Sequence, residues 1–320
     1  MRKSRYPLAI GLLTGVVLDA VFGDPRRGHP VAAFGRVASA AENRIYADSR
    51  SRGAAYTAAC VLAATIPAAA VARSTRRSPL AAAATAALAT WTVTGARSLT
   101  LEAERRSAEL QAHDLPAARE GLRALCARDP SGLDADAIAR AVVESVAENT
   151  SDAVVAPLLW GAVGGVPGLV AYRAINTLDA MVGYRSPRYA RFGWASARLD
   201  DLANLIPARV TALLTVACAP VVGGSPKQAL RAWRTYGSRH PSPNAGRCEA
   251  AFAGALGVTL GGENVYDGVA ETRPTLGDGR APEPEDIRRA VRLSRAVTWA
   301  AAALAATVVG VSHPRRVLFR

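Results

Sequence analysis

The sequence predicts an all-α, polytopic integral membrane protein with additional amphipathic or soluble helices and long polar loops. Half of the 320 residues are hydrophobic but only 6% are aromatic, so alanine supplies much of the apolar character. Two long uncharged segments, 54–72 and 79–95, are joined by the short basic link from Arg73 to Ser78. A helix needs about 20 apolar residues to cross a hydrocarbon core of ~30 Å. These two segments therefore predict a membrane-embedded helical hairpin.

Further apolar segments extend this prediction along the chain. The full set of predicted membrane segments is 8–23, 54–72, 79–95, 153–175, 205–223 and 294–312. The first is short and contains Asp19, and the fourth is broken by Pro157, Gly164-Gly165 and Pro167. Broken backbone at membrane depth is tolerated only where protein or a cavity covers it, so 153–175 is expected to be kinked, discontinuous or re-entrant. From the segment lengths we expect roughly four to six crossings.

The polar parts of the chain lie among these segments. Residues 97–149 are rich in Glu and Arg at helical spacing and predict a polar helical insert, and residues 224–293 predict a polar loop region. No internal repeat is visible, so residues 1–320 are expected to form one domain. Arginine occurs in almost every loop, and the positive-inside rule therefore does not choose an orientation.

The net charge of +13 comes almost wholly from arginines spread along the chain. Nucleic-acid binding is not expected, because the arginines form no stripe and no aromatic residues are interleaved with them. Basic loops beside apolar segments suit an anionic lipid bilayer instead, and we expect a multi-pass protein of the cytoplasmic membrane. The four cysteines match no metal-ligand spacing and are expected to be reduced and structural. The basic N-terminal MRKSR is followed by no small-residue cleavage site, so no cleavable signal peptide is expected.

The most informative polar stretch is ESVAENTSDAVVAPLLW, in which Glu144, Glu148 and Asp152 are spaced four residues apart. Four-residue steps on a helix leave these carboxylates in one narrow stripe. Like charges at this spacing oppose the helix by about 0.2–0.5 kcal/mol per pair. A solvated acidic face is the simpler interpretation. The alternative is a functional site, because the stripe opens into an apolar segment and ionisable groups inside membrane segments are usually functional.

Other candidate polar residues lie before and after this stretch. Asp179, Asp200 and Asp201 lie near Arg173, Arg185, Arg198 and Arg209, and could simply pair with them in a packed bundle. His29 and His240 each precede a proline, which is most often a structural turn. A histidine of ordinary pKa near 6.5 is also able to act as a general base. The sequence alone leaves both alternatives open.

Five stretches together resemble the adenosylcobinamide-phosphate synthase, or cobinamide synthase, family of cobalamin-biosynthesis membrane proteins. They are GDPRRGHPVAAFGR (23–36), ESVAENTSDAVVAPLLW (144–160), YRAINTLDAMVGYR (172–185), RYARFGWASARLDDLANLIPARVTA (188–212) and HPSPNAGRCEAAFAGALGVTLGG (240–262). The resemblance covers nearly the whole chain, and five long motifs in order are very specific. The segment GGENVYDG departs from the family pattern near Glu263 and Val265, which leaves the role of that loop open.

The resemblance implies ATP-dependent formation of an amide bond between adenosylcobyric acid and (R)-1-aminopropan-2-ol or its O-phosphate. It also implies Mg²⁺ as the ion on ATP, a site on the cytoplasmic side, and other late corrinoid-pathway membrane enzymes as partners. No GxxxxGK[ST] or kinase-type Gly-rich loop is present, so the nucleotide site must be built differently.

Under this interpretation the polar residues take three roles. Mg²⁺ takes oxygen ligands and usually one or two protein carboxylates, for which the candidates are Glu144, Glu148 and Asp152. The candidate catalytic residues are Glu148, Asp152, Asp179, Asp201 and His240. The candidate substrate- and phosphate-binding residues are His29, Asn149, Asn176, Arg185, Arg198, Asn204 and Asn244, since arginines bind phosphate and amides pair with the corrin amides.

Two other functions remain as alternatives. An AmpE-like membrane sensor would share the membrane architecture without corrinoid chemistry. A transporter would use broken helices and buried charges as a path, although the paired segments expected of internal symmetry are not seen.

Overall fold

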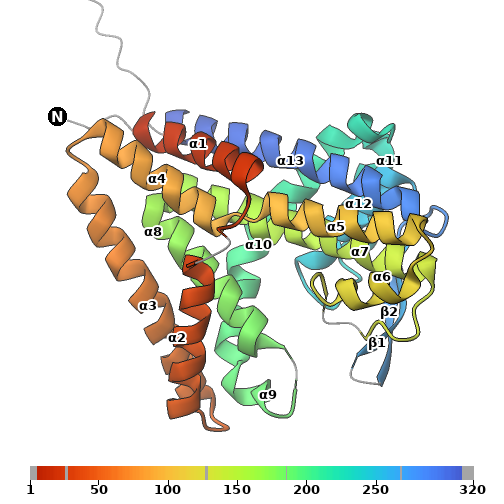
Figure 1. Ribbon diagram of the computed structural model, residues 1–320, viewed down its shortest axis with the longest axis horizontal. Coiled ribbons are helices and arrows are strands. Elements are labelled where there is room, and N and C mark those ends of the chain that lie inside the picture. The colour runs from red at the N-terminus through yellow and green to blue at the C-terminus, as the bar shows by residue number, and fades with distance from the viewer. Residues whose placement is uncertain (1–5, 26–27, 127–128, 185, 267–268, 312–320) are drawn as a thin grey trace, which may run out of the picture. The chain divides into compact units, whose positions relative to one another are not determined.

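The computed structural model describes residues 6–25, 28–126, 129–184, 186–266 and 269–311 (Figure 1). The predicted helical class is confirmed, because the described chain consists almost entirely of helices and one two-stranded sheet. The chain divides into two compact units, each assembled from separate stretches of sequence. Unit 1 comprises Met1–Gly95, Ala156–Ala203 and Ala301–Arg320; unit 2 comprises Ala96–Val155 and Asn204–Ala300. The sequence gives no composition break at these boundaries, and a single domain was expected.

Unit 1 is helical throughout its described residues. Its elements are α1 (Tyr6–Phe22), α2 (Pro30–Ile45), α3 (Arg50–Thr75), α4 (Pro79–Val93), α8 (Ala156–Leu178), the π-helical turn η2 (Asp179–Gly183), α9 (Tyr189–Phe192), the first residues of α10 (Trp194–Cys218) and the last of α13 (Pro284–Val311).

Small residues bring α1 and α4 together, and the two helices run side by side in Figure 1. Gly11 and Gly15 form a GxxxG pattern on α1. A Cβ added to Gly11 would lie 2.4 Å from the Cβ of Ala86, and one added to Gly15 would lie 2.3 Å from the Cβ of Thr90. The backbones therefore approach closely enough for van der Waals packing to hold the pair where no hydrophobic driving force acts.

Four helices in the described part of the chain are long and apolar enough to cross a membrane. They are Arg50–Thr75, the continuous run Ala135–Gly183, Trp194–Val222 and Pro284–Val311. These four contain the predicted segments 54–72 and 153–175 and most of 205–223 and 294–312. The predicted segment 8–23 corresponds to the shorter apolar helix α1 of 17 residues, and 79–95 corresponds to α4, of 15 residues. Both are shorter than the ~20 residues that a straight crossing requires.

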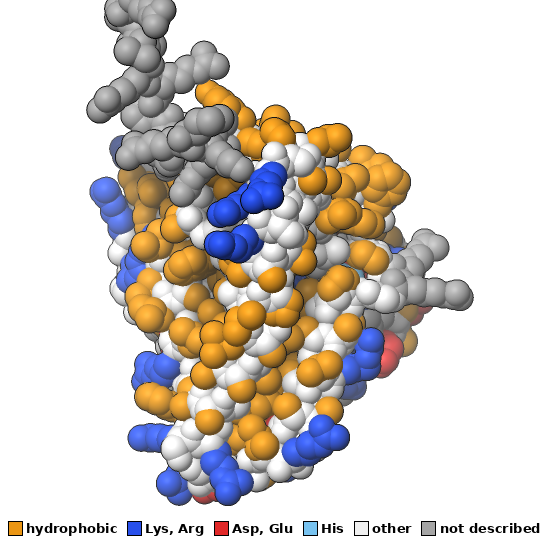
Figure 2. All heavy atoms as spheres, turned by 90° about the vertical axis from the view of Figure 1, so that its left-hand side faces the viewer, with side chains coloured by type: hydrophobic (Ala, Val, Ile, Leu, Met, Phe, Trp, Pro, Cys, Tyr) orange, Lys and Arg blue, Asp and Glu red, His pale blue; other side chains and the backbone are white. Residues whose placement is uncertain are grey.

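The helix α3 shows most directly that the protein belongs in a membrane. Only 17% of its most apolar stretch is buried in the protein, and Leu62, Ile66 and Val71 are each at least half exposed. Figure 2 shows hydrophobic side chains spread over the whole of the described face seen from this side, with basic side chains in a few groups. Such a large apolar face requires lipid to cover it.

The run Ala135–Gly183 is irregular at three places. Gly165 has a positive φ of 65° with ψ of −154°, and it bends α8 next to Pro167. A Cβ added to Gly168 would lie 2.3 Å from the carbonyl oxygen of Trp160, which a straight helix would place about 12 Å away, so the chain folds back on itself at the break predicted in 153–175. The π turns η1 (Ser151–Val155) and η2 (Asp179–Gly183) interrupt regular helix at two of the predicted acidic positions. Such π turns occur frequently at functional sites.

Unit 2 combines helices with a hairpin. Its elements are α5 (Ala96–Gln111), α6 (Leu115–Leu122), α7 (Ala135–Thr150), η1, the remainder of α10, the 3-10 turn η3 (Ala219–Val222), α11 (Pro226–Tyr236), α12 (Ala245–Leu256), β1 (Leu260–Tyr266), β2 (Val269–Leu276) and the first part of α13. The strands pair antiparallel, from Leu260 opposite Leu276 to Tyr266 opposite Val269.

The stretch 224–293 is not the polar loop region that the sequence suggested. It contains α11, α12, the hairpin and the first turns of α13. Ten of the twelve residues of α12 are buried, among them Cys248, Glu249 and Phe252. Alanine and glycine on every side of α12 let neighbouring backbone approach all around it, so the helix carries no polar face for a sequence pattern to reveal.

Candidate functional site

The acidic stripe on α7 divides into a structural and an accessible part. Glu144 is buried, and its Oε1 accepts a hydrogen bond of 2.7 Å from the backbone N–H of Gly261. Arg140 donates to the carbonyl oxygen of the same glycine, also at 2.7 Å. Gly261 has a φ of 83°, which favours glycine. Glu144 and Arg140 therefore fix the base of the hairpin against α7.

Glu148, one turn further, is exposed, and Asp152 is partly exposed within η1. A π turn accommodates an extra residue, so Asp152 leaves the α-helical stripe that the four-residue spacing predicted. Asn149 turns its amide back to Ser145, with 3.0 Å to the carbonyl oxygen and 3.2 Å to Oγ. Glu148 and Asp152 are the carboxylates of this stretch that a ligand can reach.

The buried thiol of Cys248 shows which groups gather around α12. It lies within electrostatic range of Asp152, Glu148 and Glu249. Burial, reinforced by these acids, raises the pKa of the Cys248 thiol well above its ordinary value. Carboxylates from α7, η1 and α12 thus share one neighbourhood in unit 2. The thiol stays protonated there and acts as a small packing group.

Two arginines lie beside this neighbourhood. Arg209 on α10 donates to the carbonyl oxygen of Leu205 at 2.7 Å and lies 3.4 Å from Oδ1 of Asn244. Arg209 and Arg247 are close enough to repel each other electrostatically. The Nε of Arg247 is buried and has no hydrogen-bond partner among the described residues. Two neighbouring guanidinium groups, one with an unused buried donor, suit an anion with several oxygens, such as phosphate.

His240 is held in the turn before α12. Its Nδ1 accepts the backbone N–H of Ser242 at 3.0 Å, while its Nε2 lies 3.9 Å from Oε1 of Glu249 and 3.5 Å from a guanidinium nitrogen of Arg273. Because Nδ1 is an acceptor, the proton of the neutral ring is assigned to Nε2, which faces the Glu249 carboxylate. Nδ1 is thereby occupied, and Nε2 faces both a carboxylate and a guanidinium group. The role of general base for His240 stays a prediction.

The predicted site residues fall into two sets. Unit 2 contains Glu144, Glu148, Asn149, Asp152, Asn204, His240 and Asn244. Unit 1 contains His29, Asn176, Asp179, Arg198 and Asp201. Arg185 lies outside the described residues. Asn204 and Asn244 are buried on α10 and at the start of α12, respectively.

In unit 1 the predicted residues make local contacts. Arg198 and Asp201 are 3.9 Å apart on one helix, with 68% and 36% of their side chains exposed, which is the surface ion pair that the simpler interpretation expected. The Asn176 amide lies 3.4 Å from Oδ1 of the buried Asp200. Asp179 folds over the glycine that ends η2, since a Cβ on Gly183 would lie 1.8 Å from its Oδ1.

Among the described residues, no group of three or more His, Cys, Asp or Glu side chains could hold a metal ion. The predicted three-carboxylate set therefore does not form, because Glu144 is committed to Gly261 and η1 displaces Asp152. Glu148 and Asp152 remain. Two carboxylates suit Mg²⁺, which usually keeps waters and takes the remaining ligands from substrate phosphates.

Two charged residues of this site were missed by sequence reasoning. Glu249 and Arg247 lie on α12, directly after NAG in the motif HPSPNAGRCEAAF. A charged pair in an otherwise Ala-rich helix was the available signal, because such residues are rarely buried unless they have a partner.

Comparison with known proteins identifies the family. The family model described as CobD/Cbib protein matches residues 12–294. The chain belongs to the CobD/Cbib family. A CobD/Cbib relative from Mycobacterium tuberculosis (strain ATCC 25618 / H37Rv), named cobalamin biosynthesis protein CobD, is 56% identical over 96% of this chain and 97% of its own length. Relatives of the same name from Geobacter metallireducens and Chromobacterium violaceum are 48% and 43% identical, over 85% and 95% of this chain and 87% and 99% of their own lengths. No solved structure matches.

Membership of the CobD/Cbib family assigns the chain to cobalamin biosynthesis. The resemblance seen in the sequence motifs is thereby confirmed at the level of the family. The carboxylates and arginines assigned to this site belong to motifs that carried that resemblance, namely 144–160, 188–212 and 240–262.

Proposed function

We propose that this CobD/Cbib protein is a biosynthetic ligase that couples adenosylcobyric acid to (R)-1-aminopropan-2-ol or its O-phosphate at the expense of ATP. The observation that carries the proposal is the pairing, in unit 2, of two accessible carboxylates with two neighbouring arginines around α12. A site that binds a nucleotide polyphosphate with a divalent ion needs both charge types, and Glu148, Asp152, Arg209 and Arg247 supply them.

The fit of Mg²⁺ and ATP rests on these donors. Glu148 and Asp152 would hold Mg²⁺ together with phosphate oxygens, and the ion supplies neutralisation of phosphate charge when bound. Arg247 would direct its unused Nε donor at a phosphate oxygen. Arg209 would bind beside it, because an anion placed next to both guanidinium groups relieves their mutual repulsion. Asn244, which already contacts Arg209, positions that guanidinium.

The coupling balances in two steps. The propionate oxygen forms a bond to the terminal phosphorus of ATP and ADP leaves, so the carboxyl gains a phosphate leaving group. The amine nitrogen then bonds to the acyl carbon, phosphate departs, and a proton leaves the nitrogen. We assign that proton to the departing inorganic phosphate, since phosphate groups with a second pKa of about 6 or above take up protons near neutral pH.

The proposed location is the cell membrane, with several crossings and the site open to the cytoplasm, where ATP is present. The four long apolar helices support this location. Other membrane enzymes that act late in the corrinoid pathway are the proposed partners, since substrate and product are large and would be passed on near the bilayer.

Purified protein in lipid nanodiscs, with adenosylcobyric acid, ATP and Mg²⁺, tests the proposal. Aminopropanol and its O-phosphate are supplied in separate reactions, and mass spectrometry measures the amide product alongside released ADP. Glu148→Gln is expected to lose more than about 100-fold in rate. The matched control is Asp136→Asn, which removes an exposed carboxylate from the first turn of the same helix and should change the rate less than about twofold.

Absence of ATP-dependent product with either amine, from folded protein and verified substrates, would overturn the proposed function. Equal rates for Glu148→Gln and Asp136→Asn would overturn the assignment of the site while leaving the reaction intact.

A further inference from the structure

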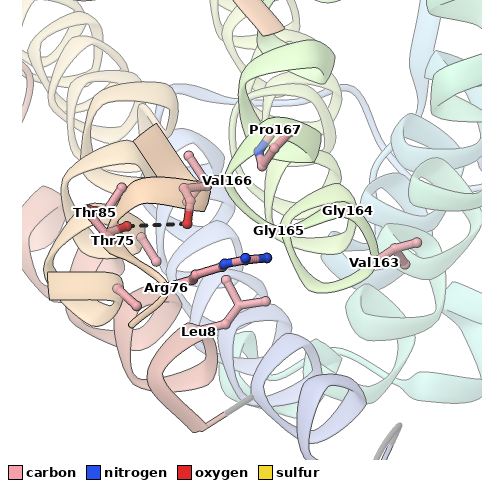
Figure 3. Close-up of a pocket in the computed structure, with 12 residues that line it drawn as sticks. Leu8, Thr75, Arg76, Thr85, Val163, Gly164, Gly165, Val166 and Pro167 are labelled. Atoms are coloured by element: carbon pink, nitrogen blue, oxygen red, sulfur yellow. Dashed lines mark hydrogen bonds between the residues drawn. The ribbon is translucent and has the colours of Figure 1, made fainter. Parts of the chain in front are cut away.

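A cavity of about 340 Å³ lies within unit 1, and none of the site residues named above lines it. The end of α3 supplies Ala72 and Arg76, the start of α4 supplies Ala82, the kink of α8 supplies Gly164 to Pro167, and α1 supplies Leu8. In Figure 3 the side chain of Arg76 extends from the end of α3 into the space that Leu8 and the Gly164-Gly165 kink border. The proposed ligase chemistry makes no use of this cavity.

The polar chemistry of the cavity is cationic. Arg76 presents a guanidinium group that binds phosphate oxygens bidentately. Thr75 does not compete for such a ligand, because its hydroxyl donates to the carbonyl oxygen of Val71 at 3.0 Å. Arg73 and Arg77 flank Arg76 in the link between α3 and α4, and this link carries no acidic residue. The site therefore suits an anion.

The break in α8 at Gly165 adds exposed backbone carbonyl groups, which accept hydrogen bonds, to the wall of the cavity. Pro167 has no N–H to donate to the carbonyl of Val163 four residues earlier, and Gly165 leaves helical geometry altogether. A ligand with hydroxyl groups next to its phosphate can donate to backbone carbonyls exposed in this way.

The remaining lining is apolar. Leu8, Ala82, Ala86, Val163 and Val166 line the cavity, and Val163 is 69% exposed. The cavity also lies at the end of α3, a helix long enough to cross a membrane. An arginine at such a position lies at the depth of lipid headgroups, while the apolar lining lies at the depth of acyl chains. Free phosphate would match the arginine but would leave the apolar wall uncovered.

We propose that this cavity binds one anionic phospholipid, with the headgroup phosphate on Arg76 and an acyl chain against the apolar walls of α1, α4 and α8. The ligand is a phosphodiester lipid of net negative charge such as phosphatidylglycerol. A zwitterionic lipid carries an ammonium group that the surrounding arginines repel, so it binds less well.

Native mass spectrometry of the full chain, released from detergent with defined lipid, tests the proposal. The protein is titrated with phosphatidylglycerol, with phosphatidylcholine and with inorganic phosphate. We expect a first phosphatidylglycerol to bind about tenfold more tightly than phosphatidylcholine, and inorganic phosphate neither to bind at this site nor to displace the lipid. Arg76→Ala should weaken the first phosphatidylglycerol about tenfold.

Arg77→Ala is the matched control, because it removes the same charge from the same link without lining the cavity. It should weaken the first lipid less than about threefold. Ala72→Phe, which fills the cavity and keeps every charge, should weaken it as much as Arg76→Ala. Equal losses for Arg76→Ala and Arg77→Ala, no effect of Ala72→Phe, or binding of inorganic phosphate in place of lipid would each overturn the proposal.

Discussion

The two His-Pro turns, one in each unit, have the same local geometry in different surroundings. In His29-Pro30-Val31 the histidine Nδ1 accepts the N–H of Val31 at 3.2 Å, and in His240-Pro241-Ser242 it accepts the N–H of Ser242 at 3.0 Å. The other ring nitrogen faces a carboxylate in each turn, Asp24 at 3.8 Å and Glu249 at 3.9 Å. The proline lacks an N–H, so the ring satisfies the next backbone donor along the chain.

The difference between the turns is burial. His29 and Asp24 have 18% and 36% of their side chains exposed, against 7% and 6% for His240 and Glu249. Arg273 adds a cation to the second turn. Electrostatic interactions are several times stronger away from water, so the same pair is a helix cap in unit 1 and part of a charged network in unit 2. The local sequence therefore determines which ring nitrogen accepts the backbone hydrogen bond. The burial of the surroundings determines how much the histidine–carboxylate pair contributes to stability.

Removing the carboxylate that faces the histidine in each turn gives the largest expected effect on stability. It also tests the comparison of the two turns most directly. Glu249→Ala removes the buried carboxylate that His240 faces and should lower the free energy of unfolding by about 3 kcal/mol. Asp24→Ala removes a partly exposed partner and should lower it by about 1 kcal/mol or less. Unfolding in mixed detergent micelles followed by circular dichroism measures both. Equal losses would show that burial does not separate the two turns.

The pH dependence of stability tests how strongly the surroundings of Glu249 are buried, through the thiol of the neighbouring residue Cys248. The raised pKa of the buried thiol means that the folded protein keeps a proton that the unfolded chain loses above about pH 8.5. The folded state then binds more protons, so stability is unaffected below about pH 8.5 and falls above it by about 1.4 kcal/mol per pH unit until the folded pKa is reached. Thermal unfolding of wild type and Cys248→Ala at pH 7 to 10 measures this.

The slope should disappear in Cys248→Ala. The control is Cys126→Ala, which removes a partly exposed thiol of unit 2 and should leave the slope unchanged. A slope that persists without Cys248 would assign the pH dependence to another group.

The His29 cap of α2 in unit 1 should contribute less to the free energy of unfolding than Glu249 does in unit 2. His29→Ala removes the acceptor for the Val31 N–H at the start of α2 and should lower the free energy of unfolding by about 1 kcal/mol. His29→Asn offers an amide oxygen at a comparable distance from the backbone and should restore most of it. A loss of equal size in both variants would indicate that the ring itself, through packing, supports α2.

The smallest effect is expected from His240→Gln, measured as the rate of amide formation. The glutamine amide can still donate toward Glu249, so the rate should fall less than about tenfold. A general base would instead cost about 100-fold to 10,000-fold. His240→Ala is the comparison variant, and a loss as large as that for a base in both variants would support the predicted role of His240 as a general base.

The sequence predicted the helical membrane class, the long apolar segments and the broken backbone near Gly165, because length and hydropathy depend on composition alone. It also identified the family from its motifs. It did not predict η1, since no residue pattern marks a π turn, and Asp152 therefore leaves the stripe that Glu144 and Glu148 begin. The distinction between Glu144, tied to Gly261, and exposed Glu148 depends on a hairpin far along the chain.

Burial by distant segments also explains what was missed around α12. Cys248 and Glu249 are buried, and Arg247 is partly so, in a helix whose alanines give no amphipathic signal. The surrounding elements come from α7, α10 and α11, and only the folded chain shows which charges they enclose.

The glycine contact between α1 and α4 has a consequence for how the protein is made. During synthesis α1 leaves the ribosome before α4 exists, and at 17 residues it is a marginal anchor by itself. The face of α1 that carries Gly11 and Gly15 packs against Ala86 and Thr90. These two residues are synthesised only after the link between α3 and α4. The first helix must therefore be retained at the insertion machinery, or lie at the bilayer surface, until its partner emerges.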